Sequence, residues 1–331
     1  MLSRQEISGI LRNKDKGKAR SLFAEADRLR RQYTGDDVHL RGIIEFSNHC
    51  RQDCLYCGLR RSNKNLIRYR MPPKEILSVS KSARRADIRT VVLQSGEDPQ
   101  YNIGEFCGLI GKIKKLDVAV TVCIGECSYA DYRRLKEAGA DRYLLKFETS
   151  DAVLYKKFRP GNTLSRRLEC LAWLKKLKFQ VGSGIMVGLP GQTFESIAGD
   201  ILIFEKLGLD MIGIGPFIPH PDTPLAGSKR IDLGTVLKVV AITRMVTGNA
   251  HIPATTAVGS IDAVGREKAL QAGANVVMPD LTPARYRRYY DIYPGKICVG
   301  EDAEECLPCL YRRIQSIGRR VSVTRGDSLK L

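Results

Sequence analysis

Short β-rich runs alternate with longer amphipathic segments along most of this chain, and the alternation predicts its elements. The short runs predict eight strands: Arg41–Phe46, Thr90–Gln94, Ala119–Ile124, Arg142–Phe147, Val181–Val187, Met211–Pro216, Ile252–Ala257 and Asn275–Met278. Segments of helical period lie between them, such as 73–86, 164–178 and 194–208. In 164–178, leucines recur at three- and four-residue spacing and form one apolar face.

The repeated strand–helix order indicates an α/β fold. Eight βα alternations without a break in composition predict one complete (β/α)8 TIM barrel, and βαβ crossovers make its sheet parallel. The prediction assigns residues 36–295 to this barrel. We expect residues 1–35 to be an N-terminal helical extension and residues 296–331 to be a C-terminal appendage that contains cysteines.

Composition narrows the class of protein. The chain has 331 residues, 43% hydrophobic and 27% charged, which is typical of a globular protein with a large core. No run approaches the roughly 20 apolar residues that span a bilayer, and the first residues contain no apolar stretch of a signal peptide. We therefore expect no membrane association. Ten cysteines then indicate a reducing cytoplasm, where metal binding or catalysis is commoner than disulfide formation.

The net charge of +18 raises the question of nucleic acid binding. Lys and Arg are scattered over helix-like segments such as 81–89 and 311–320, without a dense basic tail or an interleaved aromatic platform. This pattern favours solvated helix faces. Nucleic acid is therefore disfavoured as a partner, whereas an anionic substrate or an acidic protein partner is compatible with the charge.

The chemically unusual sequence follows the carboxyl ends of the predicted strands. These loops contain a cysteine run and then QSGEDP, GEC, FETS, GLPGQT, PFIPHPDTPL, TTAVGS and PDLTP. In a (β/α)8 barrel such loops share one mouth, where barrel enzymes carry their chemistry. We therefore expect an active site at this mouth.

The cysteine run, C-x3-C-x2-C, consists of Cys50, Cys54 and Cys57. Zinc normally takes four ligands and disulfides use cysteines in pairs, whereas a four-iron cluster can take three thiolates and leave one iron open. The run therefore favours a [4Fe-4S] cluster. A zinc site completed by His49 is the alternative. Other cysteines within helical patterns, Cys107 and Cys170, are expected to be buried free thiols.

With the aromatic Tyr56 before its last cysteine, the run resembles the radical S-adenosylmethionine (SAM) superfamily. In that superfamily SAM chelates the open iron, so the resemblance implies SAM as the second cofactor. The segment Ser95, Gly96, Glu97 and Asp98 resembles the loop that receives the SAM amino group. The loop GLPGQT, which contains Gly188 and Pro190, resembles the loop near the adenine.

A closer resemblance extends over almost the whole chain. The segments CLYCGLRRSNKNLIRYRM, VVLQSGEDP, GLPGQT, GIGPFIPHPDTPLA, IPATTA and YPGKIC are similar to the HydE family of FeFe-hydrogenase maturases. In outline that family is similar to biotin synthase and methylornithine synthase. It implies SAM contacts from Glu148 and Arg167, and an internal cavity whose substrate end is lined by Thr255 and Thr256.

The HydE resemblance implies a function in assembly of the di-iron subsite of the hydrogenase H-cluster. SAM would be cleaved reductively to a 5′-deoxyadenosyl radical, which attacks sulfur of a small-molecule or organometallic iron–cysteine substrate. The implied partners are a reductant protein of ferredoxin or flavodoxin type and other hydrogenase maturases.

Three positions depart from the HydE pattern. Lys146, Phe147 and Glu148 stand where the family commonly has Arg-His-Glu, and Lys lacks the planar fork of Arg. Lys146 is expected in the substrate cavity, where this change would alter anion recognition. Cys123 replaces a small hydroxyl residue expected near SAM. These departures leave open a HydE-like enzyme that acts on a different small substrate, derived from an amino acid or a thiol.

A second cysteine set, Cys298, Cys306 and Cys309, has the spacing C-x7-C-x2-C. Similarity to a subset of HydE proteins implies an accessory cluster of two or four irons without a catalytic role, and a labile zinc site is the alternative.

Two other functions of the whole protein stay open. One is a zinc-dependent nucleic-acid-binding protein that uses both cysteine sets. The other is an iron–sulfur scaffold without enzymatic activity, for which the SGED and GLPGQT loops would have no purpose.

Overall fold

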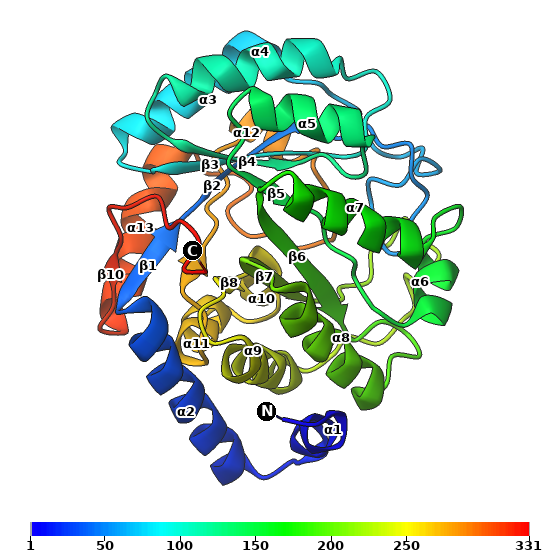
Figure 1. Ribbon diagram of the computed structural model, residues 1–331, viewed down its shortest axis with the longest axis vertical. Coiled ribbons are helices and arrows are strands. Elements are labelled where there is room, and N and C mark those ends of the chain that lie inside the picture. Colours follow the sequence, from blue (N-terminus) through cyan, green and yellow to red (C-terminus); the bar gives the residue numbers. More distant parts are fainter. Residues whose placement is uncertain (1, 331) are drawn as a thin grey trace.

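The computed structural model describes residues 2–330 and has an α/β fold, with strands in the middle and helices around them (Figure 1). The strands are β1 Asp37–Leu40, β2 Gly42–Ser47, β3 Thr90–Ser95, β4 Ala119–Cys123, β5 Arg142–Leu144, β6 Gln180–Val187, β7 Met211–Pro216, β8 Pro253–Ala254, β9 Val276–Val277 and β10 Arg320–Val321. The helices are α1 Arg4–Arg12, α2 Lys16–Thr34, α3 Pro73–Arg85, α4 Ile103–Lys114, α5 Tyr129–Glu137, α6 Ala152–Phe158, α7 Leu164–Lys176, α8 Phe194–Leu207, α9 Leu233–Thr247, α10 Thr256–Ile261, α11 Gly265–Gln271, α12 Ala284–Arg287 and α13 Ala303–Ser316.

The strands form two parallel sheets. One has the order β2-β3-β4-β5-β6-β7, and the other has the order β10-β1-β9-β8. A continuous stretch of chain joins the sheets, because only Arg41 separates β1 from β2. Isolated parallel bridges join them further, between Ile43 and Asp280 and between Met211 and His251. The two edges of the larger sheet are therefore each linked to the smaller one.

Each strand expected from the sequence overlaps a strand of the structure, from β2 to β9 in chain order. The α/β class is confirmed. The sequence does not predict β1 and β10, which pair with each other near the two ends of the chain. Strand β8 is shorter than the expected Ile252–Ala257, because α10 begins at Thr256.

The helices turn their apolar faces towards the sheets. In α7, Cys170, Leu171 and Leu174 are buried, as the leucine spacing predicts. Helix α8 begins at a Thr193 N-cap and ends at Gly208, whose left-handed conformation costs a glycine little. One large apolar cluster fills the interior. Among the helices of residues 2–330, none is long and apolar enough to cross a membrane.

Helices α1 and α2 pack on the outside of α8 and α9 (Figure 1). The Ser8 hydroxyl donates to the Glu195 carboxylate at 2.7 Å, and Arg4 donates to the Glu195 carbonyl at 3.0 Å. Two apolar residues of α1, Ile7 and Leu11, are buried. Most of residues 4–34 are thus helical and lie against α8 and α9.

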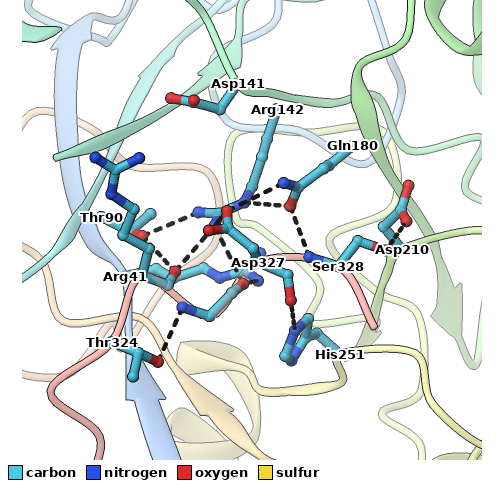
Figure 2. Close-up of polar contacts among 12 residues, drawn as sticks. Arg41, Thr90, Asp141, Arg142, Gln180, Asp210, His251, Thr324, Asp327 and Ser328 are labelled. Atoms are coloured by element: carbon cyan, nitrogen blue, oxygen red, sulfur yellow. Dashed lines mark hydrogen bonds and ion pairs between the residues drawn. The ribbon is translucent and has the colours of Figure 1, made fainter. Parts of the chain in front are cut away.

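The C-terminal tail crosses the amino ends of the strands. Figure 2 shows Asp327 among side chains from several strands: it accepts from Arg142 at 2.7 Å and from Gln180 at 3.0 Å. These are the first residues of β5 and β6. Thr90, the first residue of β3, donates to the Arg325 carbonyl at 2.8 Å. The tail therefore covers one end of the sheets, and the loops at the carboxyl ends of the strands lie at the opposite end.

Candidate active site

The cysteine run lies in an irregular loop directly after β2. Arg68 stabilises this loop by donating to the carbonyl oxygens of Asn48 at 2.6 Å, Leu59 at 2.9 Å and Arg60 at 2.8 Å. The buried Asn48 amide donates to the Tyr289 carbonyl at 2.7 Å, which connects the loop to the C-terminal part of the chain. Side chains thus supply the hydrogen bonds that regular structure would otherwise provide.

A compact zinc site limits the distances between its ligands. A single zinc ion holds sulfur ligands about 3.8 Å apart, because Zn–S bonds are about 2.3 Å long and tetrahedral. Within residues 2–330, one group of three candidate ligand atoms lies within 4.8 Å of one another, and it contains neither Cys50, Cys54 and Cys57 nor His49. A compact zinc site is therefore not formed by these side chains, whereas three thiols on one loop fit a [4Fe-4S] cluster.

Burial raises the pKa of all three of these thiols. Cys54 is buried, and Cys50 and Cys57 are half-buried. Thiolates in such surroundings need a compensating positive charge, which a cluster of iron ions supplies.

The loop after β3 touches the cysteine loop. A Cβ atom on Gly96 would lie 2.3 Å from the His49 carbonyl oxygen and 2.8 Å from the Cys50 Cβ, so only glycine permits this approach. The Arg51 N–H donates to the Glu97 carbonyl at 2.9 Å. The loop expected to bind SAM and the loop expected to bind the cluster are therefore adjacent.

Buried charges surround this contact. Glu97 Oε1 lies 3.8 Å from Arg159 Nη2 and 3.7 Å from Arg167 Nη2, and Arg167 Nε lies 2.9 Å from Glu126 Oε1. Three buried atoms here make no hydrogen bond within the described chain: Arg159 Nε, Arg167 Nη2 and Glu126 Oε1. A buried group of both signs, in which two guanidinium N–H groups lack an acceptor and Glu126 Oε1 has only its ion pair with Arg167, fits a bound zwitterion such as SAM.

Tyr56 lies beside this charged group. Its hydroxyl accepts from Arg159 at 2.9 Å, and burial raises its pKa well above the usual range. Its ring packs on a small apolar cluster that includes Leu189 and Phe217. Gly188 has φ +95°, and a Cβ there would lie 2.6 Å from Ile231. The loop with Gly188 and Pro190 therefore approaches the cysteine loop through this apolar cluster.

Strand β5 is followed by a strained turn at Glu148, whose φ of +64° is rare for a residue other than glycine. Glu148 Oε2 lies 2.9 Å from Lys146 Nζ but makes no hydrogen bond in the described chain. Phe147, between them, is fully buried, and its ring lies 5.6 Å from that of Phe204 on α8. The position where HydE proteins commonly have His thus faces helix α8.

An internal cavity of ≈ 310 Å³ connects the two ends of the expected active site. Its lining includes residues that the sequence singles out: Tyr56, Cys57, Lys146, Glu148, Thr255 and Thr256. The Thr255 hydroxyl donates to the Ile214 carbonyl at 3.2 Å, which orients this side chain. The structure therefore brings a cluster cysteine and the expected substrate residues to one cavity.

Three further charged residues line this cavity, and the sequence analysis gives none of them a role: Glu45, Asp280 and Lys296. Lys296 Nζ lies 2.8 Å from Asp280 Oδ2 and also contacts Glu45 Oε2. None of the three side chains is more than 7% exposed. An acid within the apolar strand segment GIIEFS is the one signal that could have indicated this group, because buried acids require a partner.

The protonation of this group follows from its surroundings. Burial and the neighbouring Asp280 raise the pKa of Glu45 well above its usual range. Burial acts to raise the pKa of Asp280, but Lys296 and Arg287 lower it. Burial opposes the charge of Lys296, yet Glu45 and Asp280 raise its pKa. The cavity wall therefore holds a Lys296–Asp280 ion pair beside Glu45, whose raised pKa favours the neutral form of its carboxyl.

The other expected residues lie around the cavity. Ser95 and Glu97 line a neighbouring pocket of ≈ 500 Å³ together with Arg166. Cys123 ends β4, and burial raises its pKa to about 12. Cys170 is buried, as expected, whereas Cys107 is only half-buried.

The accessory cysteines are only partly brought together. The ligand atoms of Cys298, Glu301 and Cys306 lie within 4.8 Å of one another. Cys309 is exposed and lies outside this group in the described part of the chain. Hydrogen bonding with Cys306 lowers the pKa of Cys298 to about 6.

Comparison with known proteins connects this site to a family. Residues 44–204 match the sequence family described as the Radical SAM superfamily. The chain is 51% identical over 318 residues to the [FeFe] hydrogenase maturase subunit HydE of Thermotoga maritima, covering 96% of this chain and 91% of that protein. It is 29% identical to the 3-methylornithine synthase of Methanosarcina acetivorans, covering 83% of this chain and 79% of that protein.

Solved structures agree with this relationship. Methylornithine synthase (PylB) superimposes with a TM-score of 0.87 at 25% identity, covering 97% of this chain and 94% of that one. HydG, a maturase of the [FeFe]-hydrogenase, superimposes with a TM-score of 0.83 at 18% identity, covering 98% and 73%. The likeness to HydG shows a shared fold alone.

Proposed function

This chain belongs to the radical SAM superfamily and, within it, to the HydE family of FeFe-hydrogenase maturases, and on that premise we propose its reaction. The chain is a radical SAM enzyme. We propose that it acts in assembly of the di-iron subsite of the H-cluster, on an organometallic iron–cysteine complex or a related small molecule. The observation that supports this most is the single cavity that Cys57 shares with Lys146, Thr255 and Thr256.

We propose that Cys50, Cys54 and Cys57 hold a [4Fe-4S] cluster with one iron open to SAM. When bound, these cofactors supply the reductive cleavage of SAM to methionine and a 5′-deoxyadenosyl radical. The task of the chain is to hold SAM, orient the substrate and exclude water. A protein of ferredoxin or flavodoxin type is the proposed electron donor.

The unused polar atoms suggest which parts of SAM each residue contacts. The Nη2 of Arg167, which lies 3.7 Å from Glu97 Oε1 and makes no hydrogen bond in the described chain, is a donor suited to the SAM carboxylate. Glu148 Oε2, whose ion-pair partner is Lys146 Nζ at 2.9 Å, is an acceptor suited to a hydroxyl or ammonium group. The loop of Ser95, Gly96 and Glu97 is proposed to receive the amino group. Other residues proposed to surround SAM are Tyr56, Cys123, Gly188 and Pro190.

At the far end of the cavity, Lys146 and the hydroxyls of Thr255 and Thr256 are proposed to bind an anionic part of the substrate. Lys is a point charge on a flexible stem, so it can follow a ligand but cannot grip it with two parallel hydrogen bonds as Arg does. This difference favours a second candidate function, a HydE-like enzyme with another small substrate.

We also propose that the two sheets form one closed (β/α)8 barrel, spanning residues 36–295 between a helical extension and a C-terminal appendage. The bridges at Ile43 and Met211 support closure along both edges of the larger sheet.

A cytoplasmic location is proposed because reduced thiols are needed for the cluster. The accessory cysteines are proposed to bind metal without entering the radical reaction.

Changing Glu148 to Gln or Arg167 to Ala should weaken SAM binding while the main cluster stays in place. Loss of a charge-assisted hydrogen bond costs about 1.5–3 kcal/mol, or roughly ten- to over a hundred-fold in affinity. Equilibrium binding of SAM to reconstituted protein measures this effect.

Matched controls lie on the outer surface of α5. Arg133 is paired there with Glu137 at 3.7 Å, and both side chains are exposed. Arg133→Ala and Glu137→Gln should leave SAM affinity nearly unchanged. Equal SAM affinity in the wild type and in both site variants would move the cofactor away from Glu148 and Arg167.

The wild-type protein should replace HydE in a cell-free hydrogenase maturation mixture. Lys146→Arg, which restores the residue common in the family, should change the efficiency of maturation and leave SAM cleavage without substrate nearly unchanged. The measurements are hydrogenase activity and 5′-deoxyadenosine formation.

A wild-type protein that cleaves SAM but fails beside an active HydE control would refute the maturase assignment and leave the radical SAM assignment intact. In that case the second candidate function gains support, and the family of small molecules to test begins with amino acids and thiols that fit a cavity of ≈ 310 Å³.

A further inference from the structure

We propose that an acidic one-electron carrier docks on the surface around Arg61, Lys156 and Lys157, three exposed cations that we call the donor face. The inference deepens the proposed function and rests on it, because it assigns the place at which the electron donor delivers each electron. In that step the carrier loses one electron and the cluster gains it, and no bond forms or breaks.

The donor face is built directly on the loop that contains the cysteine run. The Arg61 N–H donates to the Gln52 carbonyl at 2.8 Å. The Leu55 N–H donates to the carbonyl of Phe158, the last residue of α6, at 2.9 Å. Gln52 and Leu55 belong to the cysteine run itself. Both basic segments of the donor face therefore contact the loop that is proposed to hold the cluster.

Helix α6 carries its two lysines beside an exposed apolar residue. Val153 is 77% exposed, and Lys156 and Lys157 follow it after three and four residues, a spacing that brings side chains to one face of a helix. Lys157 Nζ lies 5.4 Å from the centre of the buried Phe158 ring, so its charge stays near the residue that contacts the cysteine loop. This helix face therefore offers a partner both positive charge and an apolar contact.

The three cations of the donor face have no acidic partner within residues 2–330, where no carboxylate oxygen lies within 4.0 Å of their nitrogen atoms. Helices α2, α5 and α7 differ from α6, because each pairs a surface arginine with an acid three or four residues away. Even the neighbouring Arg60 is paired, with Asp53 at 2.8 Å. Unpaired surface cations attract an acidic protein and steer it during its approach.

The architecture leaves this side of the molecule for electron entry. Helices surround the sheets, and the C-terminal tail covers the amino ends of the strands (Figure 1). The cysteine loop lies at the opposite end, where Cys57 lines the cavity and Cys50 is half-buried. Electron transfer slows steeply with distance. A carrier protein must therefore contact the exposed side of this loop, where Arg61 and the end of α6 lie.

The test uses full-length protein with a reconstituted cluster, and an acidic flavodoxin kept reduced by its NADPH-dependent reductase. Changing Arg61, Lys156 and Lys157 together to Glu should raise the KM for flavodoxin at least about ten-fold, since electrostatic steering changes association rates by about 10- to 1,000-fold. A rise in ionic strength from about 0.05 M to about 0.5 M should raise the KM of the wild type and change that of the variant little. The readout is 5′-deoxyadenosine formation. Cleavage driven by dithionite, a small reductant that needs no docking, should stay within about two-fold of the wild type.

The matched control changes Arg20, Lys112 and Lys115 together to Glu. These are exposed cations of the same types, and they lie on α2 and at the end of α4, apart from α6 in Figure 1. Lys112 stands in the last turn of its helix, as Lys156 and Lys157 do, so the control also covers the effect of charge reversal at a helix C-terminus. The control should keep the wild-type KM for flavodoxin.

A milder variant guards against a folding defect. Lys156→Gln with Lys157→Gln removes two charges and keeps good helix formers, so it should raise the KM in the same direction by a smaller factor. An unchanged KM in both donor-face variants overturns the proposal. So does a KM that rises equally in the control and in the donor-face variants.

Binding of oxidised flavodoxin, measured by isothermal titration calorimetry, separates this proposal from the proposed function. The wild type and the control should bind it with the same affinity, and the triple Glu variant should bind it at least about ten-fold more weakly. Equal affinity in all three proteins would refute the donor face alone. Wild-type protein that binds flavodoxin but does not cleave SAM with dithionite would refute the proposed function alone.

Discussion

Changing Cys50, Cys54 and Cys57 together to alanine should reduce SAM cleavage to the level of a reaction without protein. The reason is that Cys123 and Cys127, the other thiols near Glu97 in the described chain, are too few to supply the three thiolates of a cluster. The iron content should fall by about four per chain, as loss of one [4Fe-4S] cluster requires. Anaerobic reconstitution, iron analysis and 5′-deoxyadenosine formation under reduction measure these effects.

The matched control changes Cys298, Cys306 and Cys309 together to serine. It removes the same number of thiols but should largely spare SAM cleavage. A folded Cys50/Cys54/Cys57 variant that still forms 5′-deoxyadenosine would refute the cluster assignment. Complete loss of cleavage in the control would instead make the accessory site an essential electron relay.

The fold was predictable where local pattern determines it. The order of strands and helices follows from runs of β-formers separated by helical periods, and these signals are local in sequence. Strands β1 and β10 were missed because their residues are few and partly polar, and their pairing joins Asp37 to Arg320. Arg41 is likewise buried although charged, and it donates to the Gly326 carbonyl of the tail at 3.0 Å. No local pattern contains that contact.

The candidate site likewise has one part that the sequence predicts and one part that it does not. Cysteine spacing and short glycine loops pointed to the cluster end, because these motifs are contiguous. The Lys296–Asp280 pair with Glu45 was missed, because its members come from segments far apart in the chain and form a pattern only after folding.

Phe147 is a departure from the family whose surroundings the sequence does not reveal. It stands where the family commonly has His, between Lys146 and Glu148. In the structure alternate residues face opposite sides, so Phe147 packs on Phe204 while its neighbours line the cavity. Of the two departures on this strand, only Lys146 therefore bears on the substrate.

The second large effect concerns Lys296. Changing Lys296 to Met should lower the free energy of unfolding by about 3–5 kcal/mol, because it leaves the buried Asp280 carboxylate without its nearest cation. Arg287 Nε, at 3.7 Å from Asp280 Oδ1, is too distant to replace it fully. Chemical unfolding under anaerobic conditions, followed by far-ultraviolet circular dichroism, measures the change.

Glu45→Gln is the variant to compare with Lys296→Met. The raised pKa of Glu45 determines how this substitution changes the pH dependence of the free energy of unfolding. An acid whose pKa is higher in the folded than in the unfolded state stabilises the fold below its unfolded pKa, and that stability is lost as pH rises towards the folded pKa. The loss approaches about 1.4 kcal/mol per pH unit while only the folded form is protonated.

Glu45→Gln removes this contribution of Glu45 and keeps the shape of the protonated acid, so it should cost about 1 kcal/mol or less at neutral pH. Comparison of unfolding at pH 6 and pH 8 should therefore show a steeper loss of stability in the wild type than in the Gln variant, while Asp200, whose pKa burial raises to about 7, contributes equally to both. Equal costs for Lys296→Met and Glu45→Gln would contradict the Lys296–Asp280 pair as the charged element of the cavity wall.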